Sequence, residues 1–244
     1  RLTAILTNQV QVLANIPPQY VDKLREEQID VRAFPNLEVS SLMFNFKGIF
    51  ADKNLREAVY YALATDYAEK FGAGYLLPTD QFSASGMSGY SRKLEERNQN
   101  VETANEFRAK HEGTVDVVLD VPMGLEKFAE KIKSDLAAID INVTVLVSDP
   151  PDFQNKILSG KSDFYFFGWK YDLADVSDFF ETVVHGQSAE YGSFNGMGYA
   201  DSEVDNLIEQ AAQLLNVSER QEMLGQISKR ILDDRIGVPI FESE

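Results

Sequence analysis

The chain has 244 residues, of which 44% are apolar and 25% charged, and its formal net charge is −16. This length can bury one generous core or two modest ones, and the negative charge disfavours a nucleic acid partner because it repels the phosphate backbone. The absence of cysteine excludes disulfides, thiolate catalysis and thiolate metal sites. No apolar run approaches the ~20 residues that cross a bilayer.

The amino end is expected to start inside a larger protein. Residues 1–11 have the pattern of the end of a helix, there is no initiator methionine, and a short apolar segment follows at 10–16. Pro17 and Pro18 then predict the first turn of another helix, because proline is tolerated there. The apolar side chains that follow at helical spacing support this prediction; they are Tyr20, Val21 and Leu24.

A strand and a helix are predicted next. The strand covers 39–47, where Leu42, Phe44 and Phe46 alternate with other residues and define one face. Asp52 is a plausible N-cap for the helix that follows it. Residues 72–100 are rich in Gly, Ser and Pro and predict a long surface loop, which at this length is usually functional or mobile.

A short polar helix at 101–111 leads into a βαβ unit. The unit has strands at 114–121 and 141–147 and a helix at 124–139 between them, so the two strands are expected to be parallel with a right-handed crossover. Apolar residues three or four apart form the core face of this helix: Leu125, Phe128, Ile132, Leu136 and Ile139.

The stretch at 162–180, SDFYFFGWKYDLADVSDFF, contains the candidate site. A helix at 150–160 precedes it, and the aromatic run 164–167, punctuated by Gly168, predicts a strand buried on both faces. Trp169, Tyr171 and Asp172 then follow just past the carboxyl end of that strand. Ligands of open α/β sheets gather in the crevice outside such ends.

A purely structural interpretation of this stretch stays open from spacing alone. In it Trp169 fills the core and Asp172 caps a helix at 175–184. Asp172, Asp175 and Asp178 are spaced by three, which on a helix could raise a proton affinity or hold a hard cation. For Asp175 and Asp178 a solvated helix start is favoured because negative charge near a helix N-terminus is stabilising.

The rest of the chain predicts a glycine-rich aromatic loop at 191–199, a helix capped by Asp201, a last helix at 217–234 and a closing strand from Gly237. Inward positions on the last helix are Leu224, Ile227 and Ile231. His111 and His185 lie in unrelated elements without a carboxylate or second histidine at ligand spacing, so a histidine metal site is not expected. No nucleophile elbow, phosphate loop or dinucleotide fingerprint is present.

Several short motifs, taken in order, carry a resemblance to a known family. FGWKYDLADVSDFF at 167–180 resembles the segment of the peptide and nickel family of extracellular solute-binding proteins (family 5) in which a Gly-Trp pair precedes an Ala-Asp-Tyr-x-Asp-Pro-like turn. Val176 stands where that family commonly has proline. The elements at 16–24, 52–66 and 201–211 are similar to the family's IPP-x-x-V-x-x-L, D-x-x-V-R-x-A-L-x-Y-A-I-D-R and N-P-E-V-D-x-L-L-x-x-A motifs.

The resemblance implies an α/β, periplasmic-binding-protein-like lobe with a layered mixed sheet flanked by helices. Residues 1–43 are then part of a first lobe, 44–240 the second, ligand-binding lobe, and 241–244 the start of the return to the first. The implied function is the capture of peptides or a related small solute for an ABC importer, in a cleft between two lobes.

In this interpretation Trp169, Tyr171 and Asp172 bind the ligand, and Asp172 matches the aspartate that pairs with a peptide's α-ammonium. No cofactor, metal or catalytic residue is implied, so no enzyme activity is expected. The implied partners are the solute and the ABC permease subunits, with no nucleic acid, and the implied state is a monomer. The implied location is the periplasm or the extracellular face of the membrane, with a lipoprotein anchor on the full-length protein.

Two alternatives from other classes remain. One is a hydrolase that uses Asp172 with a carboxylate from another loop. The other is a regulatory or scaffold module that keeps the lobe but has lost the ligand.

Overall fold

The computed structural model describes residues 1–16, 20–91, 94 and 96–243. The strands are β1 (Glu38–Phe44), β2 (Leu76–Pro78), β3 (Val115–Pro122), β4 (Ile141–Ser148), β5 (Phe164–Lys170) and β6 (Gly237–Ser243). The helices are α1 (Leu2–Leu6), α2 (Val21–Glu26), α3 (Lys53–Ala62), α4 (Tyr67–Gly72), α5 (Val101–Arg108), α6 (Glu126–Ala137), α7 (Pro150–Leu158), α8 (Ser177–Phe179), α9 (Ser202–Gln213) and α10 (Val217–Asp233).

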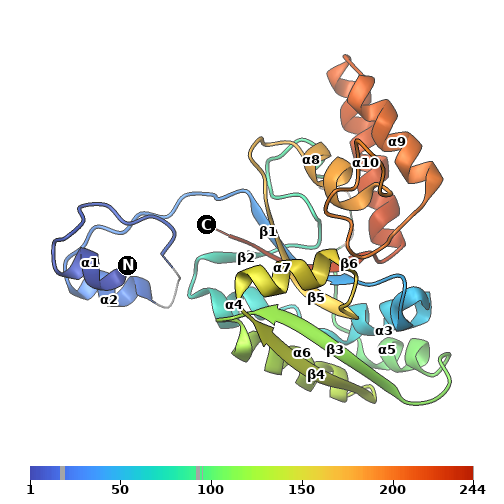
Figure 1. The fold of residues 1–244 in the computed structure, drawn as a ribbon, viewed down its shortest axis with the longest axis horizontal. Coiled ribbons are helices and arrows are strands. Elements are labelled where there is room, and N and C mark those ends of the chain that lie inside the picture. The colour runs from blue at the N-terminus through green and yellow to red at the C-terminus, as the bar shows by residue number, and fades with distance from the viewer. Residues whose placement is uncertain (17–19, 92–93, 95, 244) are drawn as a thin grey trace.

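The six strands form one mixed sheet with the order β2-β6-β1-β5-β3-β4. β1 is antiparallel to both of its neighbours, β5 and β6, whereas β3 is parallel to both β4 and β5. The predicted βαβ unit is confirmed, because β3 and β4 pair in parallel from Val115↔Ile141 to Pro122↔Ser148 with α6 between them in sequence. The expected layered α/β lobe with a mixed sheet is therefore observed (Figure 1).

Helices cover both faces of this sheet and create two apolar cores. The first core joins the sheet to α3, α4 and α6, and the second joins it to α8, α9 and α10. β1 serves both cores, with Leu42 and Phe44 in the first and Val39 and Met43 in the second. The predicted strand at 39–47 is confirmed as β1, which ends at Phe44, and every residue from Val39 to Phe44 is buried.

Predicted core positions on α6 and α10 are confirmed. Phe128, Ile132 and Leu136 of α6 are at most 2% exposed. On α10, Leu224, Ile227 and Ile231 are fully buried in the second core.

The predicted N-caps are confirmed as well. Asp52 accepts the backbone N–H of Asn54 at the start of α3, and Asp201 accepts those of Glu203 and Val204 at the start of α9. These contacts satisfy backbone donors that have no partner inside the helix.

Other local predictions require correction. The expected loop at 72–100 is preceded by α4 and contains β2, whose register with β6 begins at Leu76↔Ser243. That partner is distant in sequence, so no local pattern indicates it. The helix expected at 175–184 is one turn of α-helix, α8, followed by a π-helical turn at Phe180–Val184. The predicted helix start at Pro17 and Pro18 lies outside the described residues.

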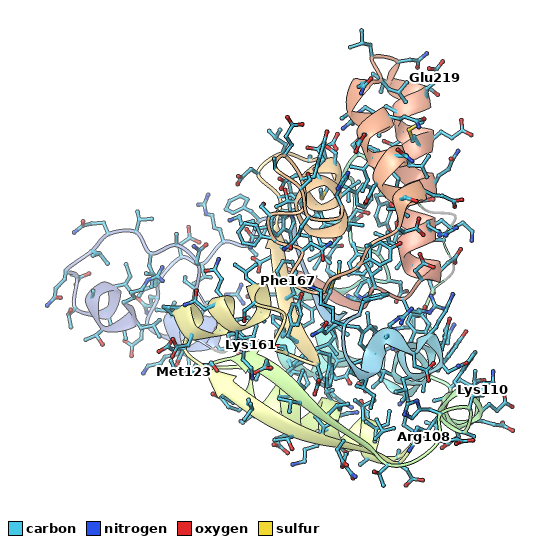
Figure 2. The ribbon with its side chains drawn as sticks, turned by 45° about the vertical axis from the view of Figure 1, so that its right-hand side comes forward. Arg108, Lys110, Met123, Lys161, Phe167 and Glu219 are labelled. Atoms are coloured by element: carbon cyan, nitrogen blue, oxygen red, sulfur yellow. The ribbon has the colours of Figure 1, made fainter. Side chains whose placement is uncertain are left out.

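The N-terminal piece with α1 and α2 extends away from the sheet in Figure 1, and α9 and α10 project on the opposite side. Figure 2 places Glu219 near the far end of the α9–α10 pair and Phe167 near the middle of the molecule. The boundaries 1–43, 44–240 and 241–244 stay predictions, and β1 and β6 run through them as continuous strands. Within the described ranges, none of the helices is long and apolar enough to span a bilayer.

Candidate functional site

The candidate site lies at the carboxyl end of β5, which is longer than predicted. β5 does not stop at Gly168 but continues through Trp169 to Lys170, because β1 supplies antiparallel partners at Val39↔Trp169 and Glu38↔Lys170. β3 pairs only with the first two residues of β5. Trp169 is therefore held by β1 in the part of β5 that extends beyond its pairing with β3, and it is not in a loop.

Aromatic rings fix the indole of Trp169 on the side of the second core. The indole stacks on Phe167, with centroids 5.9 Å apart, and meets Phe179 and Phe194 edge to face at 6.2 and 5.7 Å. Its Nε1 donates a hydrogen bond to Asp178 Oδ2 at 3.1 Å. The side chain remains partly exposed, so it combines a fixed orientation with an accessible edge.

Tyr171 is placed inside the protein. Its side chain is 2% exposed, its hydroxyl donates to the carbonyl of Phe82, and its backbone N–H donates to Leu37 O at 3.0 Å. Burial raises the pKa of its phenol well above the ordinary value, with Asp178 adding to the shift. In this structure Tyr171 anchors the chain just before Asp172 rather than offering a free group.

Asp172 is exposed, and its side chain forms no hydrogen bond or ion pair with any described residue. It does not cap a helix, because α8 begins at Ser177 with Val176 at its cap position and has no side-chain cap. Leu173 beside it is 74% exposed. The interpretation of Asp172 as a cap is therefore wrong, and its exposed side chain follows Trp169 by three residues.

Asp175 is not the solvated helix start that the spacing favoured. Its two oxygens receive Arg220 Nη1 at 2.5 Å and Nη2 at 3.1 Å, and one of them also accepts the N–H and hydroxyl of Ser177 at 2.9 and 2.7 Å. Burial raises the pKa of Asp175, but the hydrogen bonds from Arg220 and Ser177 outweigh this and hold the pKa below its usual value.

Asp178 has a partner too, the Trp169 indole described above, although its side chain is exposed. The partly buried Glu181 follows on the next turn. Burial raises its pKa, and the negative charge of Asp178 raises it further. The three aspartates that share a spacing of three therefore have three different environments.

Each histidine has a carboxylate partner that sequence spacing did not indicate. His111 Nδ1 lies 2.8 Å from Asp52 Oδ2, and His185 Nε2 lies 3.2 Å from Glu209 Oε1. Among the residues that the structure describes, no group of three or more metal-ligating side chains gathers.

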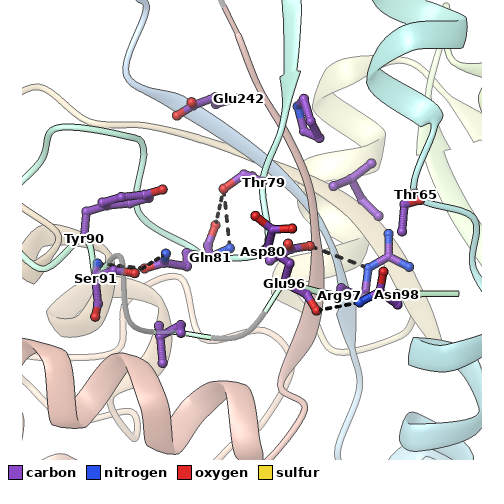
Figure 3. A pocket seen from close by; sticks show the side chains of 13 residues that line it. Thr65, Thr79, Asp80, Gln81, Tyr90, Ser91, Glu96, Arg97, Asn98 and Glu242 are labelled. Atoms are coloured by element: carbon purple, nitrogen blue, oxygen red, sulfur yellow. Dashed lines mark hydrogen bonds and ion pairs between the residues drawn. The ribbon is translucent and has the colours of Figure 1, made fainter.

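Cavities elsewhere on the molecule include two of about 580 and 650 Å³. One, of about 580 Å³, is polar and is lined by Asp80, Gln81, Arg97 and Glu242 among others (Figure 3). Two of its polar side chains already have partners, since Gln81 hydrogen-bonds with the backbone of Ser91 and Arg97 donates to the carbonyls of Leu63 and Ala64 just after α3. The other, of about 650 Å³, lies between the N-terminal piece and the sheet. Trp169, Tyr171 and Asp172 line neither cavity.

Sequence reasoning did not indicate three residues of this region. Phe194 reaches Trp169 from the loop at 191–199, which was recognised as aromatic but not as a neighbour of the site. Asp178 was considered only for a cation or a helix start. Arg220 lies 45 residues after Asp175, and no spacing rule connects them.

Solved structures share this fold over the whole chain. The periplasmic binding protein DppA from Helicobacter pylori, in complex with the peptide STSA, matches with a TM-score of 0.92 and 22% identity, over 100% of this chain and 49% of that one. NikA from Staphylococcus aureus, in complex with Ni(L-His)2, matches with a TM-score of 0.89 and 20% identity, over 99% and 53%. A dipeptide binding protein from Pseudoalteromonas sp. SM9913, in complex with Met-Leu, matches with a TM-score of 0.90 and 19% identity, over 99% and 50%.

These similarities define the fold as that of a lobe of extracellular solute-binding proteins, and the chain spans about half the length of the structures it matches. A search of curated protein sequences finds no match. The family model of the bacterial extracellular solute-binding proteins, family 5 Middle, matches residues 1–191. The chain therefore belongs to this family.

Proposed function

We propose that this chain is the ligand-capturing lobe of a binding protein that serves an ABC importer and that it binds the amino end of a peptide or a related small solute. The observation that carries the proposal is the exposed carboxylate of Asp172, which has no partner among the described residues. It directly follows the buried anchor Tyr171 and lies three residues after the fixed indole of Trp169. A carboxylate that directly follows an anchored residue at the end of a strand is suited to pair with an ammonium group.

The solved relatives support the choice of ligand class, since the complexes with STSA and Met-Leu contain peptides. In the proposal a second lobe closes over the ligand, permease subunits receive it, and the protein acts as a monomer outside the cytoplasmic membrane with a lipid anchor. Trp169 supplies an apolar wall, Asp172 the counter-charge, and Tyr171 the support beneath them. No catalytic residue and no cofactor enter the proposal.

The hydrolase alternative requires a second carboxylate that is free to act beside Asp172. Asp175 is engaged by Arg220 and Ser177, and Asp178 by the indole of Trp169. A hydrolase would therefore need its second carboxylate from another loop, whereas binding without chemistry needs no such group.

Calorimetry on the full-length protein tests the proposal, with tripeptides and their N-acetylated forms as ligands. Asp172→Asn keeps the shape but removes the charge, and losing one partner of a desolvated pair costs ~2–5 kcal/mol, a loss of affinity of about thirty-fold or more. N-acetylated peptides should bind the wild type and the variant equally poorly.

Glu112→Gln is the control, because Glu112 is exposed, has no recorded partner and carries the same charge. Unchanged affinity in a folded Asp172→Asn protein would eliminate Asp172 as the anchor of the amine.

A further inference from the structure

Residues 172–181 carry four carboxylates, yet they are not equally available to a ligand. Asp175 has a guanidinium as counter-ion, Asp178 accepts the indole N–H of Trp169, and Glu181 is partly buried with a raised pKa. Asp172 alone among these four is exposed without a recorded partner. Of these four carboxylates, Asp175 is the one whose charge a described counter-ion neutralises.

Arg220 neutralises Asp175 with a two-pronged contact. The side chains of Arg220 and Asp175 are both 24% exposed, so the pair is largely removed from solvent. Arg220 Nη2 also donates to Ser177 Oγ at 3.0 Å. Such paired N–H···O contacts are among the stronger charge-assisted hydrogen bonds and hold the carboxylate in a fixed direction.

The helix that carries Arg220 is itself firmly placed. Asn216 caps α10, and Leu224 on the next turn is fully buried. The adjacent Gln221 accepts hydrogen bonds from Ser88 Oγ at 2.9 Å and from the N–H of Gly89 at 3.1 Å. Ser88 in turn forms a parallel bridge to Asp175. α10 therefore controls both the position and the net charge of the loop that presents Asp172.

We propose that Arg220 is a specificity-determining residue that neutralises Asp175, removes one negative charge from the segment that presents Asp172, and so selects ligands with a single ammonium over ligands with a second cation. This inference rests on the proposed function of Asp172. Arg220 acts through Asp175 and does not touch the ligand. Removing its charge exposes a second carboxylate that favours an amino-terminal residue with a cationic side chain.

Asp172 and Asp175 are close enough along the chain for the charge of Asp175 to have a measurable effect on affinity. Residues three apart lie within about 11 Å even in extended chain, which is comparable to the Debye length of about 8–10 Å at physiological salt. At lower ionic strength an additional unit charge at such a distance changes the affinity for a cation about fivefold to tenfold.

The test measures the affinity of the full-length protein for Lys-Ala-Ala and for norleucine-Ala-Ala, which has a similar side chain without its charge. The readout is the ratio of the two dissociation constants at about 20 mM salt. Arg220→Met should shift this ratio in favour of the lysine peptide by about fivefold to tenfold. Arg220→Lys keeps the positive charge and should retain the wild-type ratio.

Two further variants separate selectivity from damage to the fold. Adding Asp175→Asn to Arg220→Met removes the uncovered charge and should return the ratio to the wild-type value, whatever the loss of overall affinity. Arg230→Met removes the same charge ten residues farther along α10, where its partners are Asp201 and Asp234, and should leave the ratio unchanged.

A wild-type ratio in folded Arg220→Met would overturn the inference, as would an equal shift in Arg230→Met. The proposed function fails in a different way: the wild type then binds neither peptide, or Asp172→Asn binds both as tightly as the wild type. Either of those two results removes the basis of the inference as well. The inference is supported if Arg220→Met shifts the ratio of the two dissociation constants and adding Asp175→Asn returns it to the wild-type value.

Discussion

Trp169 donates its indole N–H to Asp178, nine residues later, at 3.1 Å, and this bond links the end of β5 to the first turn of α8. Phe179, next to Asp178, meets the same indole edge to face. The bond therefore joins the strand that presents the aromatic wall to the segment that follows Asp172, and it fixes the exposed edge of the indole.

Replacing Asp178 should release this indole. In Asp178→Ala the Trp169 N–H loses its acceptor and turns to water, so the emission maximum is expected to move to longer wavelength. Trp169 is the single tryptophan of the chain, and fluorescence reports on it directly. The free energy of unfolding should fall by about 1 kcal/mol or less, since Asp178 is exposed. Asp178→Asn retains an acceptor and should resemble the wild type; identical spectra for Asp178→Ala and wild type would contradict the role given to this bond.

The core of the βαβ unit gives a prediction about stability. Leu136 on α6 is fully buried, so Leu136→Ala should cost ~2–5 kcal/mol of unfolding free energy through lost burial and the cavity left behind. Glu130 on the same helix is exposed, and Glu130→Ala should change stability by less than about 0.5 kcal/mol. Urea midpoints of the two variants decide the matter, and similar midpoints would show that α6 is packed differently.

Much of the fold could be predicted because its signals are local. Two patterns reflect burial against the neighbouring layer: the alternating valines of β3 and β4, and the spacing of Phe128, Ile132 and Leu136. Both are visible within about ten consecutive residues of the sequence. Asp52 and Asp201 were recognisable as caps for the same reason.

What the sequence did not reveal depends on distant partners. β2 is only three residues long and exists because β6 pairs with it, and β5 extends to Lys170 because β1 is its neighbour. At the site, Trp169 and Asp172 were found from an aromatic strand end and a family resemblance. Their electrostatic setting was not, because it depends on Arg220, which the tertiary fold brings to Asp175.

Acid should destabilise the protein partly through Asp201. Burial raises the pKa of this carboxyl, but the N–H groups of Val204 and Glu203 and the guanidinium of Arg230 outweigh it, so its folded pKa is lowered. A carboxyl group whose pKa is lower in the folded state stabilises the fold when it is ionised. This contribution is fully present above the unfolded pKa of about 3.9 and is lost as the pH falls through the folded pKa. Asp201→Asn keeps an N-cap side chain but cannot titrate.

Urea midpoints between pH 3 and 7 check this prediction. The wild type should lose more stability than Asp201→Asn below about pH 4, and the two should have parallel profiles above pH 5. If Asp201→Asn lost more stability in acid than the wild type does, the conclusion that folding lowers the pKa of Asp201 would be wrong.

The last prediction concerns Gly89, which contacts the segment beside Asp172. Both Gly86 and Gly89 have positive φ, +85° and +91°, so alanine is strained at either position by roughly 1–2 kcal/mol. They differ in their surroundings: a Cβ at Gly86 meets nothing within 4 Å, whereas one at Gly89 would lie 2.1 Å from Val176 Cγ1. Val176 is fully buried and cannot move without moving the chain around it.

Gly89→Ala should therefore cost about 1–3 kcal/mol more than Gly86→Ala, because overpacking is added to the same backbone strain. It should also displace the segment between Tyr171 and Ser177, since the N–H of Val176 donates to Ser88 O. Thermal or urea unfolding of the pair gives the difference in stability, and calorimetry with a tripeptide in the full-length protein gives the effect on the proposed site. Gly86→Ala should bind as tightly as the wild type and Gly89→Ala more weakly. Equal stability and equal affinity in the two variants would show that Val176 does not transmit strain to Asp172.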